Sequence, residues 1–190
     1  MNLPLTGIQV LDLTTMVPGP MCSMILGDFG AEVVKIEQPK GGDLARFSQP
    51  KLGDTSGHYL MFNRNKKSVT LNLKSDKGKE IFYQLAAQAD VIMEQNRPGV
   101  VKKLGIDYKT IEKLNPRIIY CSISGYGQDG PYAQLSGHDI NYLSYAGVLG
   151  VTSRKGQRPT IPGVQIADIG GGTLNSVIGI LLALMARQQS

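Results

Sequence analysis

Short apolar runs alternate with other patterns from the start of the chain to residue 123. Runs of strand length cover residues 8–13, 31–37, 68–73, 91–94 and 117–123, and glycines, prolines or polar residues lie between them. This order predicts an α/β fold with a doubly wound, mostly parallel, Rossmann-like sheet and helices on both faces. In such folds, ligands bind beyond the carboxyl ends of the strands.

The segments between and after these runs carry helix signals. Pro18 stands where a first helical turn begins, and Ser75 followed by Asp76 is typical of a helix N-terminus. The last helix has only about ten strongly apolar positions where a membrane span needs about 20, so we expect a packing helix and no membrane contact. We expect helices over 18–28, 76–89, 99–104, 108–114, 138–149 and 173–186, and a long surface loop over 38–67.

Composition narrows the class of protein. The 190 residues suffice for one domain with its own core, and Cys22 and Cys121 form no C-x-x-C pair, so we expect a reduced, cytoplasmic protein without a metal site. The net charge of +5 favours an anionic partner. Nucleic acid is not expected, because Trp is absent, aromatic residues make up only 6% of the chain, and no recognition motif accompanies the charge.

The first strand–helix–strand unit imitates a dinucleotide-binding site, because its second strand ends in Glu37. The glycine fingerprint of such sites is absent, and Val17-Pro18-Gly19-Pro20 stands in its place. Prolines lack the backbone N–H groups that a pyrophosphate cradle uses. The pattern therefore argues against NAD or FAD.

His138 and Asp168 are the two residues whose surroundings suggest chemistry. His138 follows a glycine-rich loop and begins a helical stretch, and Asp168 precedes Gly170, Gly171 and Gly172 at the start of the last helix. An imidazole and a carboxylate together can move protons near neutral pH. On the pattern alone, a hydrogen-bonded structural histidine and a helix-capping aspartate are the commoner explanations.

Whether His138 and Asp168 are catalytic or structural depends on further motifs. Short motifs occur at residues 5–12, 27–37, 63–68, 96–99, 124–128 and 167–172. Together they resemble the family III CoA-transferases, the CaiB/BaiF superfamily, and the resemblance runs from Leu3 to Arg187. Within that family, the sequence GHDINYL at 137–143 resembles the α-methylacyl-CoA racemase branch, in which the histidine is an acid/base residue. Transferase members resemble this chain at the aspartate but typically lack the histidine.

The resemblance implies a CoA thioester as substrate and no cofactor beyond coenzyme A itself. His138 and Asp168 would flank the carbon beside the thioester carbonyl. One would remove its proton and the other would return a proton to the opposite face, with an enolate between the two steps. Backbone N–H groups at the start of the Asp168 helix would stabilise the enolate oxygen.

Four cations match positions that hold or approach the CoA nucleotide in the family: Arg97, Lys35, Arg64 and Lys67. Full-length members continue with a smaller domain and form interlocked homodimers, so the resemblance implies that residues 1–190 are the CoA-binding large domain of such a dimer. Two alternatives stay open. One is CoA transfer with Asp168 as nucleophile, and the other is a CoA-binding fragment without activity.

Overall fold

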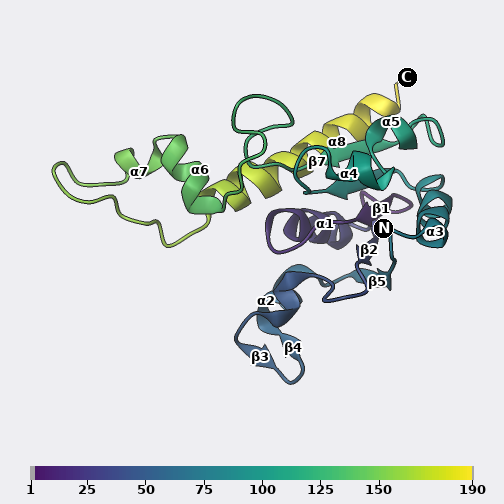
Figure 1. The fold of residues 1–190 in the computed structure, drawn as a ribbon, viewed down its shortest axis with the longest axis horizontal. Helices are drawn as coiled ribbons and strands as arrows, with labels where there is room; N and C mark the ends of the chain where they lie inside the picture. Colours follow the sequence, from purple (N-terminus) through teal and green to yellow (C-terminus); the bar gives the residue numbers. More distant parts are fainter. Residues whose placement is uncertain (1–2, 190) are drawn as a thin grey trace.

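The computed structural model describes residues 3–189, and a parallel β-sheet lies at its centre (Figure 1). The strands lie in the order β5-β2-β1-β6-β7, and each pairs in parallel with its neighbours. The predicted doubly wound, parallel α/β fold is therefore confirmed. The five strands are β1 (Gln9–Asp12), β2 (Glu32–Glu37), β5 (Lys66–Thr70), β6 (Val91–Glu94) and β7 (Ile119–Ser122).

Two apolar cores lie on opposite faces of the sheet. Val91 and Met93 of β6 join one core and Ile92 joins the other, because successive side chains of a strand point to opposite faces. Residues of α1 and α8 complete the first core, and residues of α3, α4 and α5 complete the second. These helices are α1 (Pro18–Asp28), α3 (Asp76–Ala86), α4 (Val100–Leu104), α5 (Tyr108–Ile111) and α8 (Asn175–Arg187).

The expected surface loop at 38–67 is not a plain loop. It contains short elements, and β5 begins at Lys66, two residues earlier than predicted. Arg46 ties this region to the sheet by donating to both carboxylate oxygens of Glu37, at 2.7 and 2.6 Å, with its guanidinium 3.8 Å above the Tyr59 ring. The short elements are η1 (Leu44–Phe47), β3 (Lys51–Leu52), β4 (Thr55–Ser56) and α2 (Gly57–Phe62).

The last helix is longer than predicted. A π-helical segment, η2 (Ile166–Leu174), runs directly into α8, so one helix extends over Ile166–Arg187. By length and composition this 22-residue helix could cross a membrane, and the helix expected over 173–186 is shorter than the one observed. Ile180 and Leu184 are buried in the first core, whereas Ile178 and Leu182 are 54% and 60% exposed.

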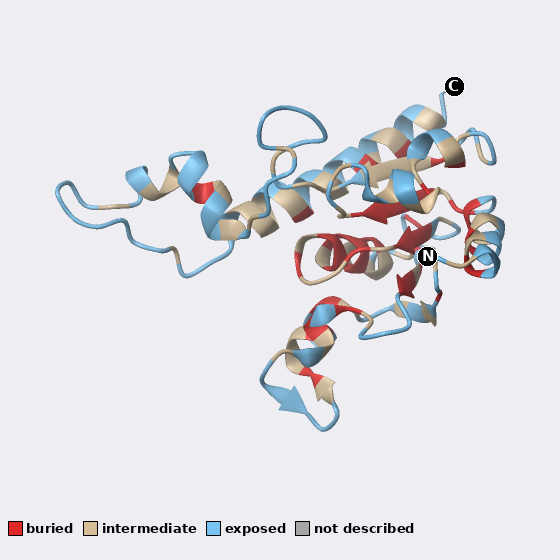
Figure 2. Ribbon diagram, in the orientation of Figure 1, coloured by how far each residue is buried: buried red, intermediate tan, exposed pale blue. Residues whose placement is uncertain are grey.

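The predicted helix at 138–149 is divided into α6 (Asp139–Tyr145) and α7 (Val148–Val151). The break falls at Gly147, whose φ of 76° lies in the left-handed region that favours glycine. Together with residues 152–164 these helices extend away from the sheet, and most of their surface is exposed (Figure 2). This projecting arm begins at His138, the N-cap of α6.

Candidate active site

The candidate site lies where the strand order reverses. The chain passes from β1 to β2 on one side and later to β6 on the other, so the loops after β1 and β6 diverge and leave a crevice. A cavity of about 610 Å³ opens there. Its walls come from the loops after β1, β6 and β7, the residues before α6, and η2.

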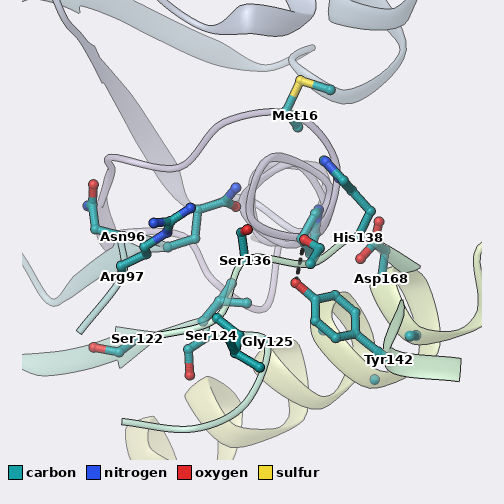
Figure 3. Close-up of a pocket in the computed structure, with 18 of the residues that line it drawn as sticks. Met16, Asn96, Arg97, Ser122, Ser124, Gly125, Ser136, His138, Tyr142 and Asp168 are labelled. Carbon is teal, nitrogen blue, oxygen red and sulfur yellow. Dashed lines mark hydrogen bonds between the residues drawn. The ribbon is translucent and has the colours of Figure 1, made fainter. Parts of the chain in front are cut away.

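His138 lines this cavity from the N-cap of α6, beside Asp168 (Figure 3). Its backbone N–H donates to Asn141 Oδ1 at 2.9 Å, which satisfies one of the N–H groups at the helix start. The side chain is exposed, so a ligand in the cavity can reach the imidazole. The prediction that His138 stands at a helix start is confirmed.

Asp168 lies in the first turn of η2 and is not its cap, because the helix already begins at Ile166. Single π-helical segments are frequent at functional sites. The Asp168 backbone N–H donates to Asp139 Oδ1 at 2.9 Å, so this amide is not free for an enolate oxygen. Burial and then the Asp139 carboxylate raise the pKa of Asp168, and His138 offsets part of this rise. A carboxyl with a raised pKa is a better proton acceptor than an ordinary aspartate.

The Tyr142 ring leaves no room for side chains at two glycines of the neighbouring loops. Its hydroxyl donates to the Gly137 carbonyl oxygen at 2.6 Å, and its ring lines the cavity. A side chain at Gly125 or Gly137 would collide with this ring. Burial and the Asp168 carboxylate raise the pKa of Tyr142, so its hydroxyl keeps the proton that it donates. The ring therefore holds the loop after β7 and the start of α6 together.

Arg97 lines the same cavity on the side opposite His138 and Asp168 (Figure 3). It follows β6 in the loop Gln95–Pro98 and is exposed. Within residues 3–189, its side chain has neither a hydrogen bond nor an ion pair to another residue. Its guanidinium is therefore available to an anionic ligand.

The other three predicted cations line neither this cavity nor the second one described below. Lys35 is fully buried, and its ammonium donates to the Thr14 carbonyl oxygen at 2.7 Å. Arg64 and Lys67 are exposed and form ion pairs with the carboxylates of Asp28 and Glu32. The structure therefore does not bring Lys35, Arg64 and Lys67 together with Arg97.

A second cavity, of about 530 Å³, lies beside the first, and Asn96 lines both. Its wall includes Lys40 and Lys74, which follow the carboxyl ends of β2 and β5 and are exposed. Sequence reasoning missed these two lysines. Their position just beyond parallel strands was the available signal, because that edge of the sheet is where ligands bind.

Among residues 3–189, no three His, Cys, Asp or Glu side chains gather in a way that suits a metal ion. The cavity instead combines an imidazole, a carboxylate and a guanidinium. Such a set can transfer protons at one end and bind an anion at the other.

Comparison with known proteins identifies the family. The model of CoA-transferase family III matches residues 5–190. The chain belongs to this family. It is 44% identical over 170 residues to human succinyl-CoA:glutarate CoA-transferase, covering 89% of this chain and 39% of that enzyme. It is 40% identical over 186 residues to mouse alpha-methylacyl-CoA racemase, covering 98% of this chain and 45% of that enzyme.

Solved structures agree with this assignment. A CaiB/BaiF family protein from Brucella suis superposes on the whole chain with a TM-score of 0.93 and 36% identity, and the match covers 51% of that protein. A protein from Mycobacterium tuberculosis superposes with a TM-score of 0.90 and 36% identity over 99% of this chain and 52% of that protein. The chain therefore spans about half the length of the family members that it matches.

Proposed function

We propose that this chain carries the proton-transfer half of a CoA-thioester racemase site. The observation that supports this most strongly is that His138 and Asp168 line one cavity side by side, with Arg97 across from them. These two residues lie thirty positions apart in sequence, with His138 at the N-cap of α6 and Asp168 in the first turn of η2. The family membership supplies the substrate class, a CoA thioester.

The chemistry assigned to the pair is a 1,1-proton transfer on a 2-methylacyl group. One residue takes the proton from the carbon beside the thioester carbonyl, and the electrons of the broken C–H bond move into an enolate whose oxygen carries the negative charge. The other residue then donates a proton to the opposite face of that carbon. His138 and Asp168 both line the cavity, and the proposal places the α-carbon between them, so that each residue faces one side of that carbon.

The proposal places the pantetheine and nucleotide parts of CoA beside the positively charged residues of the two cavities. With the acyl group beside His138 and Asp168, the pantetheine arm points toward Arg97, whose guanidinium suits a pyrophosphate. The nucleotide end then enters the second cavity past Asn96, where Lys40 and Lys74 offer positive charge. This path uses both cavities with a single ligand.

CoA transfer is the second candidate, because relatives of both kinds match the chain at 40% identity or more. Here the Asp168 carboxylate attacks the thioester carbonyl, an anhydride to the enzyme forms, and the CoA thiolate leaves with the electrons of the C–S bond. The thiolate then attacks the aspartyl carbonyl and releases the donor acid, which leaves a thioester between Asp168 and CoA. The acceptor carboxylate displaces the thiolate to form a second anhydride with Asp168, and the thiolate attacks the acceptor carbonyl of that anhydride, which forms the new CoA thioester and frees the Asp168 carboxylate. The position of Asp168 on the cavity wall suits a nucleophile as well as a base.

Loss of chirality at the α-carbon distinguishes racemisation from CoA transfer. A single enantiomer of a 2-methylacyl-CoA is incubated with the 190-residue chain, and with the longest polypeptide that its gene encodes, with and without an acceptor acid. Racemisation without any acceptor supports the proposal. Transfer that requires the acceptor, together with a hydroxylamine-sensitive adduct at Asp168, supports the second candidate. CoA binding without either reaction would show that the chain binds CoA but does not catalyse racemisation or transfer.

A further inference from the structure

The loop Thr14–Met16, between β1 and α1, contributes residues to the walls of both cavities. Thr14 and Thr15 line the second cavity, and Met16 lines the one that holds His138 and Asp168. Any ligand that occupies both cavities therefore runs along this loop. Its conformation sets the shape of both.

The backbone of this loop is held by side chains. The Met16 N–H donates to Asp43 Oδ1 at 3.0 Å, and the Thr14 carbonyl oxygen accepts from Lys35 Nζ at 2.7 Å. On the other side, the Thr15 carbonyl oxygen accepts from Gln95 Nε2 at 2.7 Å. Because backbone groups that are wholly or partly shielded from water need partners, these side chains help to determine where the loop lies.

Met16 has a strained backbone, with φ of 66° in the left-handed region. Residues other than glycine, asparagine and aspartate rarely adopt this conformation, and it persists only where the surroundings enforce it. Such outliers cluster at functional sites. Here the strain falls on a residue of the cavity wall.

Asp43 is the residue that enforces it. The side chains of Asp43 and Lys35 are both fully buried, and Lys35 Nζ lies 3.0 Å from Asp43 Oδ2. The other oxygen, Oδ1, accepts from the N–H groups of Met16 and Ala45, so one carboxylate joins the loop, β2 and η1. A buried ion pair costs desolvation energy, so we assign to this pair a geometric role and not a gain in stability.

We infer that Asp43, together with Lys35, is a positioning residue that holds the Thr14–Met16 loop as the partition between the two cavities. The role of the partition in ligand recognition rests on the proposed function. The position of the loop itself does not, and it can be measured without any ligand.

The test uses a matched pair of double variants, Lys35→Met with Asp43→Ala, and Lys35→Met with Asp43→Asn. Both remove the two buried charges together, so neither charge is left unpaired, and Lys66 still pairs with Asp12 in each. They differ in whether an oxygen remains to accept from Met16. Phe82→Leu, in the core on α3, is the control for lost stability alone.

The first measurement is hydrogen exchange of the Met16 amide by NMR, without ligand. The Ala-containing variant should exchange at least about tenfold faster at this amide than the Asn-containing variant, whereas Phe82→Leu should not single it out. Equal exchange in the matched pair overturns the inference. Should the Ala-containing variant fail to fold, the unmodified chain still decides, because exchange of its Met16 amide at the rate of an unstructured peptide also overturns it.

The second measurement compares the affinities for an acyl-CoA and for CoA itself by calorimetry. Movement of Met16 should lower the ratio of the two affinities by about tenfold in the Ala-containing variant and leave it unchanged in Phe82→Leu. An unchanged ratio despite faster exchange refutes the partition. Absence of binding by the unmodified chain refutes the proposed function instead, while the exchange result still decides whether Asp43 positions the loop.

Discussion

Arg97 is the sharpest test of how the cavity recognises CoA, and Arg97→Ala is the change that removes its charge. A hydrogen bond between a cation and a phosphate contributes roughly 1.5–3 kcal/mol. Because Arg97 is exposed, the lower end of that range applies, and about 1.4 kcal/mol corresponds to a tenfold change in Kd. Arg97→Ala should therefore weaken CoA binding about tenfold. The CoA affinity of Arg97→Lys should lie between that of the unmodified chain and that of Arg97→Ala, because lysine keeps the charge but loses the planar guanidinium fork.

The assay is calorimetric titration of CoA into the chain at about 0.05 M and 0.5 M salt, because exposed charge pairs weaken as the Debye length shrinks. Arg64→Ala is the matched control, since Arg64 is also exposed but pairs with Asp28 and lines neither cavity. We expect the salt dependence to flatten in Arg97→Ala and to stay unchanged in Arg64→Ala. Equal CoA affinity in Arg97→Ala and the unmodified chain would remove Arg97 from the binding site.

Three further predictions concern stability and assembly. Burial raises the pKa of Asp12, but Lys35 and Lys66 lower it more, to about 2 against an ordinary 3.8. Its carboxylate therefore contributes about 2 kcal/mol to the free energy of unfolding. This contribution is complete above pH 4 and is lost as the pH falls toward 2. Urea unfolding from pH 6 to 2 should show this loss, and Asp12→Asn should flatten that part of the profile. Gly125→Ala should lower the urea midpoint, with a free-energy loss of about 1–3 kcal/mol, because the added methyl group collides with the Tyr142 ring; an unchanged midpoint would contradict this packing. The exposed apolar face of α8, which includes Ile178, Leu182 and Met185, should drive self-association; a constant monomer mass by light scattering at all concentrations would count against it.

The sheet was predictable because each of its strands has a recognisable local sequence pattern. Buried parallel strands are short apolar runs bounded by polar or glycine-rich segments, and all five runs became strands with ends shifted by at most three residues. The short elements between Pro39 and Lys66 were not predictable in this way. Tertiary contacts such as the Glu37–Arg46 pair stabilise them, and no local pattern records such contacts.

The site was predictable in its residues more than in its geometry. Their local surroundings in the sequence singled out His138 and Asp168, the family resemblance gave them acid/base roles, and the structure places both on one cavity. The resemblance did not distinguish Arg97, which lines that cavity, from Lys35, which is buried, because a one-dimensional pattern of cations carries no information on burial. The π-helical start at Ile166 was also missed, because the run of three glycines suggested a loop and a later helix.

Exchange of the α-proton is the most direct test of the central claim, that His138 and Asp168 transfer a proton on a CoA thioester. A 2-methylacyl-CoA is incubated in deuterated water with the unmodified protein, with His138→Ala, and with His58→Ala, which removes the other of the two histidines and lies on α2, outside the cavity. We predict deuterium at the α-carbon without any acceptor acid, a loss of about 10²–10⁴-fold in His138→Ala, and no change in His58→Ala. Exchange that survives His138→Ala intact, or a covalent adduct trapped at Asp168 in its place, would contradict the account.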